Sequence, residues 1–136
     1  EIRKKIEEYG LEKQLILKGN VKDVYQVYGD YAFLVLPSYR EGLPLVLLEA
    51  KALGLPMISF DITTGPREII NEGEDGYLIP PYHIEEMAAK IETLIIDEKQ
   101  RILFSKNTEK GIEKFCKRRI YSEWEELIET LCGGEE

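Results

Sequence analysis

The sequence lacks the features that mark membrane proteins and nucleic-acid-binding domains. No apolar run approaches the ~20 residues of a transmembrane helix. There are 18 Lys and Arg against 26 Asp and Glu, giving a net charge of −8. Binding to nucleic acid depends on clustered basic side chains that release counterions, so we expect no nucleic-acid partner. One basic cluster, at residues 117–119, is either a solvated helix face or a contact for phosphate or a membrane surface.

Cysteine is scarce as well. Cys116 and Cys132 fall in one C-terminal helical pattern, sixteen residues apart. That length of continuous helix spans about 24 Å, which is too far for a disulfide. Unpaired cysteines are typical of a reducing compartment, and the start of the chain shows no secretory signal pattern. We expect a cytoplasmic location, with the inner face of a membrane as the alternative site of action.

Motifs that would directly identify a metal site, a hydrolase or a nucleotide-binding loop are also missing. His83 is the only histidine, and no cysteine cluster accompanies it, so we expect no metal. Ser38 lies outside any Gly-x-Ser-x-Gly elbow and has no histidine near it in sequence, which argues against a serine hydrolase. Neither Gly-x-Gly-x-x-Gly nor a P-loop occurs.

What the sequence does contain is an alternation of apolar strands and helices. The 136 residues, 43% of them hydrophobic, suit one globular domain, and the start at Glu1 rather than Met favours a fragment. Strands are predicted at residues 14–18, 31–36, 56–60 and 77–79. Helices are predicted at residues 1–9, 21–28 and 44–53, from Pro66, and at 84–96, 98–112 and 117–131. This order predicts an α/β fold, a doubly wound parallel sheet with C-terminal helices.

Ligands of such sheets bind at the carboxyl ends of the strands. In this chain those ends are the loops at Gly19-Asn20, at residues 37–43 and at residues 61–65. We expect these three loops to gather at one edge.

Residues 36–53 run from an apolar strand through a turn into a helix that begins at Pro44. At about 100° per residue, Glu49 and Lys51 come out on opposite sides of this helix, so at most one of them faces solvent. Lys51 is the easier one to solvate. We therefore expect Glu49 to lie among apolar side chains, where an unpaired carboxylate costs several kcal/mol.

Two interpretations of these acids stay open from spacing alone. Glu41 and Glu49 are either hydroxyl acceptors for a vicinal diol, such as a ribose or hexose, or a surface acid and a buried acid satisfied by a neighbouring amide. Likewise, Gly42-Leu43 is either a backbone N–H cradle for phosphate at the helix start or a tight turn.

Six short blocks follow one another in a specific order. They are Gly19-Asn20-Val21, Leu36-Pro37-Ser38, Glu41-Gly42-Leu43-Pro44 with Glu49-Ala50, Gly54-Leu55-Pro56, Gly65-Pro66-Arg67-Glu68 and Asp75-Gly76-Tyr77-Leu78. Their order, around the Glu-x7-Glu signature of Glu41 and Glu49, resembles the C-terminal, donor-binding domain of retaining GT-B glycosyltransferases of the family-four, group 1 kind. The resemblance runs from about Leu15 to the last helix.

The resemblance implies a role for each matching residue. Glu49 would accept the ribose hydroxyls of a nucleotide sugar, and Glu41 would face the donor sugar where positive charge develops at the anomeric carbon. Backbone groups of Gly42 and Leu43, with Ser38, would contact the sugar or pyrophosphate. The loop of Gly19, Asn20 and Val21 would lie against the base. No metal is implied, because protein groups and a helix dipole neutralise the diphosphate.

The family's C-terminal domain normally opens with further strands, and a separate N-terminal domain holds the acceptor. The resemblance therefore implies that residues 1–136 are a single, incomplete donor domain, inactive alone, of an enzyme that transfers a hexose to a glycan, lipid-linked or other acceptor. The alternative is a non-catalytic nucleotide-sugar-binding or interaction module. An uncovered sheet edge is compatible with a homodimer of the fragment.

Overall fold

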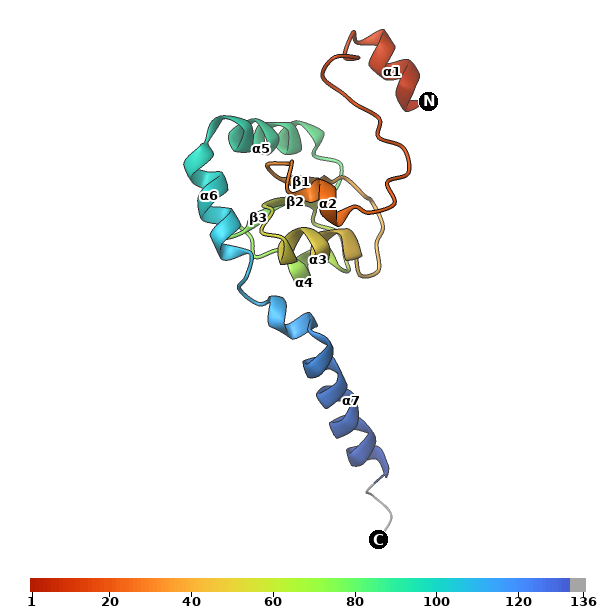
Figure 1. Cartoon of the computed structure of the whole chain (residues 1–136), viewed down its shortest axis with the longest axis vertical. Helices are drawn as coiled ribbons and strands as arrows, with labels where there is room; N and C mark the ends of the chain where they lie inside the picture. Colours follow the sequence, from red (N-terminus) through yellow and green to blue (C-terminus); the bar gives the residue numbers. More distant parts are fainter. Residues whose placement is uncertain (133–136) are drawn as a thin grey trace.

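The computed structural model describes residues 1–132, which fold around a small parallel sheet (Figure 1). Within this range three strands pair side by side, in the order β1 (Leu34–Leu36), β2 (Met57–Phe60) and β3 (Gly76–Ile79). Both pairings are parallel. Parallel strands need crossover connections, and helices usually form them. The helices around the sheet are α2 (Tyr25–Tyr28), α3 (Leu45–Ala52), α4 (Pro66–Ile69), α5 (Ile84–Ile96) and α6 (Glu98–Asn107).

β2 is the central strand, and all four of its residues are buried. Successive side chains of a strand point to opposite faces, so β2 contributes to two apolar clusters. Met57 packs with Leu47 and the rest of the α3 side. Phe60 packs on the other face with Leu94 of α5 and Phe104 of α6. Helices thus cover both faces, which confirms the predicted doubly wound parallel α/β fold.

Several predicted elements are confirmed to within one residue. The strands predicted at 56–60 and 77–79 are β2 and β3, and the helices predicted at 84–96 and from Pro66 are α5 and α4. α3 begins at Leu45 rather than Pro44, because Pro44 is still extended, with ψ of 97°, and serves as the N-cap.

Predictions for the N-terminal part are partly wrong. α1 (Ile2–Glu8) is confirmed, but residues 14–18 form no strand. Leu15, Ile16 and Leu17 are irregular and at least half exposed. A strand is held by a neighbouring backbone, and this segment pairs with none of the described strands. The helix predicted over 21–28 is only the single turn of α2.

The strand predicted over residues 31–36 is also shorter, reduced to the three residues of β1. All three are half-buried rather than buried. Within residues 1–132, β1 pairs only with β2, so no described strand pairs with its other edge.

The last helix of the described chain extends away from the sheet (Figure 1). α6 ends at Asn107, earlier than predicted, and Gly111, with a left-handed φ of 75°, starts a 3-10 turn, η1 (Ile112–Phe115). α7 (Lys117–Cys132) confirms the last predicted helix. None of its residues is buried, and its apolar row is exposed: Ile120, Tyr121, Trp124, Leu127, Ile128 and Leu131.

Candidate functional site

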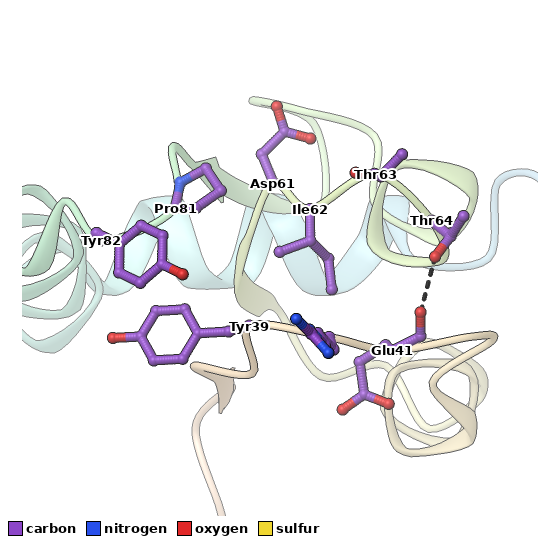
Figure 2. Close-up of a pocket in the computed structure, with 9 residues that line it drawn as sticks. Tyr39, Glu41, Asp61, Ile62, Thr63, Thr64, Pro81 and Tyr82 are labelled. Atoms are coloured by element: carbon purple, nitrogen blue, oxygen red, sulfur yellow. Dashed lines mark hydrogen bonds between the residues drawn. The ribbon is translucent and has the colours of Figure 1, made fainter.

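A cavity of about 450 Å³ opens at the carboxyl edge of the sheet (Figure 2). The loops that follow all three strands line it, as expected for ligand sites of parallel sheets. Its lining residues are Tyr39, Arg40, Glu41, Asp61, Ile62, Thr63, Thr64, Pro81 and Tyr82.

Two of the predicted loops, residues 37–43 and 61–65, are joined by a hydrogen bond here. The hydroxyl of Thr64 donates a hydrogen bond to the Glu41 carbonyl oxygen at 2.7 Å. Gly65 has φ of 93°, and a Cβ at this position would overlap the carbonyl oxygen of Gly42. A side chain at Gly65 is therefore excluded both by its backbone conformation and by the close approach of the other loop.

Charged groups of both signs surround the cavity. Glu41 is half-buried, and its carboxylate lies on the opposite side of its backbone from Thr64 (Figure 2). Arg67 and Asp61 form a bidentate ion pair. Nε donates to Oδ1, and Nη2 donates to Oδ2 at 2.6 Å. The hydrogen bond from Arg67 to Asp61 raises the pKa of this guanidinium. Arg40 makes no ion pair within the described chain, so its charge is available to a ligand.

Three aromatic rings, one from each strand or the loop after it, stack along one side of the cavity. Tyr39 lies 5.2 Å from Phe60 and 4.5 Å from Tyr82 between ring centroids, with interplanar angles of 16° and 17°. Phe60 is buried, whereas Tyr82 is 72% exposed.

The backbone of Tyr82 is unusual. Its φ is 71°, and Tyr82 is the only non-glycine residue with positive φ among residues 1–132. The amide of His83 donates to the Pro80 carbonyl at 3.1 Å, closing a turn with Pro81 and Tyr82 at its centre. Proline followed by positive φ is the pattern of a type II turn, in which glycine or asparagine normally takes the second central position. A tyrosine there costs about 1–2 kcal/mol.

Glu49 lies apart from this cavity. It is half-buried on α3, and its two carboxylate oxygens accept hydrogen bonds from the hydroxyls of Tyr25, at 3.3 Å, and Tyr28, at 3.1 Å. Its protein partners are therefore phenols and not the amide considered from sequence. Burial, followed by the hydrogen bond to Glu49, raises the pKa of Tyr28 to about 12. The negative charge of Glu49 is the main cause of the raised pKa of Tyr25.

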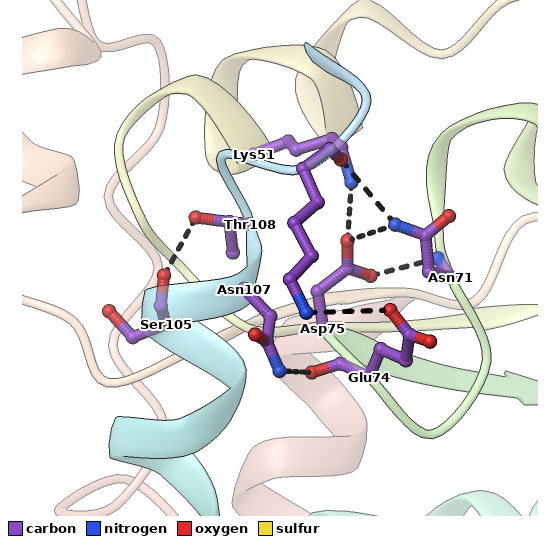
Figure 3. Close-up of polar contacts among 8 residues, drawn as sticks. Lys51, Asn71, Glu74, Asp75, Ser105, Asn107 and Thr108 are labelled. Atoms are coloured by element: carbon purple, nitrogen blue, oxygen red, sulfur yellow. Dashed lines mark hydrogen bonds and ion pairs between the residues drawn. The ribbon is translucent and has the colours of Figure 1, made fainter.

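The prediction that Lys51 is solvated is wrong. Lys51 is fully buried on the face of α3 that packs against the loop after α4, where its Nζ contacts the carboxylate of Asp75. Asp75 also accepts from the backbone N–H of Asn71 at 2.9 Å and from its side-chain amide at 3.1 Å (Figure 3). Helix periodicity correctly separates Glu49 from Lys51, but it does not say which side the rest of the fold covers.

The other predicted site residues lie partly in the loop after β1 and partly away from the cavity. Ser38 is half-buried, and Gly42 and Leu43 are exposed, all in the loop after β1. The prediction that Gly19-Asn20 joins the other two loops is wrong, because no strand precedes it. Gly19, Asn20 and Val21 are exposed, and Val21 borders a separate apolar hollow of about 230 Å³ beside β1.

Sequence reasoning missed the aromatic side of the cavity. Tyr82 follows Pro80-Pro81, the stop signal of β3. The loop after β3 could have been included as a third carboxyl-end loop on the same argument as the other two.

Among residues 1–132, no group of three or more His, Cys, Asp and Glu side chains is arranged to hold a metal ion. No helix in that range has the length and hydropathy of a membrane span. Cys116 and Cys132 are both exposed and form no disulfide within it.

Comparison with protein families matches residues 1–111 to the family described as glycosyl transferases group 1. An exopolysaccharide phosphotransferase of Streptomyces coelicolor is 37% identical over 131 residues, which cover 96% of this chain and 14% of that protein.

Solved structures give the same match. A mutant of S. aureus TarM, crystallised with fondaparinux, α-GlcNAc-glycerol and UDP, has a TM-score of 0.87 and 34% identity over 93% of this chain and 26% of that chain. The pneumococcal O-GlcNAc transferase GtfA, in complex with UDP and GlcNAc, has a TM-score of 0.82 and 30% identity over 96% and 27% of the two chains. The chain thus spans between 14 and 27% of the length of these relatives.

Proposed function

Because the chain belongs to the group 1 glycosyl transferases, we propose that it provides the donor-binding half of a retaining, nucleotide-sugar-dependent glycosyltransferase. The fold is the Rossmann-like half of a GT-B fold. The observation that carries the proposal is the cavity at the carboxyl edge of the parallel sheet, lined by loops from all three strands. TarM and GtfA were both solved with UDP, which favours a uridine nucleotide as the leaving group.

Glu49 is assigned to the ribose of the donor. An ionised carboxylate offers about four lone-pair sites, and the two phenols use one hydrogen bond on each oxygen. About two acceptor sites are left, which suits the two hydroxyls of a ribose. Tyr25 and Tyr28 at the same time offset the cost of holding the charge half-buried.

Glu41 is assigned to the donor sugar. It lines the cavity at the turn before α3, so its charge lies at the same end as the start of that helix. Transfer of a hexose builds positive charge on the anomeric carbon, and a fixed carboxylate stabilises that charge in the transition state.

The diphosphate is assigned to the loop between β1 and α3. Ser38 and the backbone N–H groups of Gly42 and Leu43 are the donors, and the start of α3 favours an anion. Arg40 supplies a positive charge in the same loop. We propose that these groups neutralise the leaving group without a metal ion.

Two further assignments rest, like that of Glu49, on parts that lie away from the cavity. Contact of Gly19, Asn20 and Val21 with the base requires this exposed segment to move towards the donor. We assign most of the contacts to the acceptor, a glycan or lipid-linked saccharide, to other regions of the full-length enzyme. The two exposed thiols fit a cytoplasmic enzyme.

Calorimetric titration of the full-length gene product with UDP-, GDP- and ADP-sugars tests the proposal. We expect one nucleotide class to bind, with the same affinity in the presence of EDTA. Binding of none of them would contradict the proposal. Binding without release of nucleoside diphosphate, when a saccharide extract is supplied, would identify a non-catalytic module.

A further inference from the structure

We propose that the Tyr39–Tyr82 stack is a platform for a saccharide, and that the open face of the Tyr82 ring carries a pyranose ring of the acceptor. The inference rests on the proposed function for the identity of the ligand as a saccharide. It adds a binding surface that lies at the other side of the cavity from Glu41.

The stack is built to present one aromatic face. The buried Phe60 ring supports Tyr39, and Tyr39 supports Tyr82 at 4.5 Å. Tyr39 is nearly parallel to both other rings, at 16° to Phe60 and 17° to Tyr82, so the Tyr82 ring is supported on one side while Tyr82 stays 72% exposed. A flat, rigid aromatic surface suits the apolar C–H face of a pyranose, because it buries apolar area with little loss of side-chain freedom.

The backbone of Tyr82 argues that this exposed ring has a purpose beyond packing. Glycine would fit the second central position of the turn after Pro81 without strain. The chain instead holds a tyrosine at φ of 71° and leaves it 72% exposed. Strain of this kind persists where the surroundings enforce it, and it clusters at ligand sites.

Polar groups beside the platform suit the hydroxyls of a sugar. Asp61 and Thr63 line the same cavity; the carboxylate accepts hydrogen bonds, and the hydroxyl both donates and accepts them. Asp61 is fixed in place by Arg67, so its orientation does not depend on the ligand. Sugar sites combine an apolar surface with a few placed polar groups in this way.

The position of the platform assigns it to the acceptor. Tyr82 follows β3, whereas Glu41 follows β1, and the two side chains lie at opposite sides of the cavity (Figure 2). A donor held by the start of α3 therefore leaves the Tyr82 face to the other substrate.

Two variants of the full-length gene product test the platform. Tyr82→Gly removes the ring and relieves the positive φ, so it should fold at least as well as the wild type. Tyr82→Phe keeps the ring and loses only the hydroxyl. The probes are methyl α-glucoside, methyl α-galactoside and methyl α-N-acetylglucosaminide, followed by saturation-transfer NMR, with UDP binding measured in parallel by calorimetry.

We expect at least one glycoside to bind the wild type, alone and with UDP present. Tyr82→Gly should weaken this binding about tenfold and Tyr82→Phe by less than about twofold, with UDP affinity unchanged in both. Equal glycoside binding by Tyr82→Gly and wild type, or no glycoside binding by a wild type that binds UDP, would overturn the platform. Displacement of the glycoside by UDP would overturn its assignment to the acceptor. Glycoside binding without UDP binding would instead contradict the proposed function and leave the platform standing.

Discussion

Lys51 and Asp75 form an ion pair with both side chains completely buried, joining α3 to the loop before β3. A charge pair inside a protein costs desolvation energy, which its mutual attraction repays only when further hydrogen bonds satisfy the remaining groups. Asn71 supplies two such bonds to Asp75. The pair therefore fixes the position of α3, the helix that carries Glu49 and follows Glu41.

Breaking this pair should be strongly destabilising. Lys51→Met leaves the Asp75 carboxylate buried without its cation, so we expect a loss of about 3–5 kcal/mol in the free energy of unfolding, measured by urea denaturation. The matched control is Glu74→Gln, on the same loop as Asp75. It removes an exposed ion pair between Glu74 and Lys110 and should leave the free energy of unfolding unchanged within error. A loss below about 1 kcal/mol for Lys51→Met would show that the buried pair is not required.

Gly65 and Gly73 form a matched test of how the two cavity loops fit together. Both have positive φ, but a Cβ at Gly73 meets nothing within 4 Å, whereas one at Gly65 overlaps the Gly42 carbonyl. Gly73→Ala should cost about 1 kcal/mol for the backbone alone. Gly65→Ala should cost at least about 2 kcal/mol, because the loops must also separate. Thermal denaturation followed by circular dichroism measures both, and equal costs would contradict the close approach.

The sequence predicted well those elements whose signals are local. β2 and β3 are short apolar runs bounded by proline or glycine. α5 is a periodic pattern that ends just before Asp97, whose side chain caps α6 by accepting a hydrogen bond from the Gln100 N–H. Residues 14–18 have an equally good strand pattern, but a strand also needs a neighbouring backbone. The five residues of this segment contain no information on whether a neighbouring strand exists.

The site was predictable only in part for a similar reason. Glu41 lines the cavity in the loop after β1, where the strand-end argument placed a ligand site. The partners of Glu49 come from tyrosines 24 and 21 residues earlier in the chain, and Lys51 meets Asp75 24 residues later. Such long-range pairings depend on how α2 and the loop before β3 pack on α3, which helix periodicity does not contain.

Tyr28 should make stability depend on alkaline pH. Its pKa is about 12 in the folded chain against an ordinary value of 10.0, so the folded state holds the proton more tightly than the unfolded state. Its contribution is therefore fully present below about pH 10 and is lost as pH rises through about 12. Urea denaturation of the wild type should show this decline, and Tyr28→Phe should lack it. An identical decline in both proteins would assign the effect to other groups.

Glu49→Gln should weaken donor binding without unfolding the protein. The amide keeps the size of the side chain but loses the negative charge that accepts hydrogen bonds from hydroxyls on both oxygens. Hydrogen bonds to charged groups contribute about 1.5–3 kcal/mol, so UDP affinity measured by calorimetry should fall by about ten- to a hundredfold. Glu92→Gln, at an exposed position on α5, is the control and should bind as the wild type does. Unchanged UDP affinity in Glu49→Gln would contradict the assignment of this carboxylate to the ribose. Tyr25 and Tyr28 would then be its only partners.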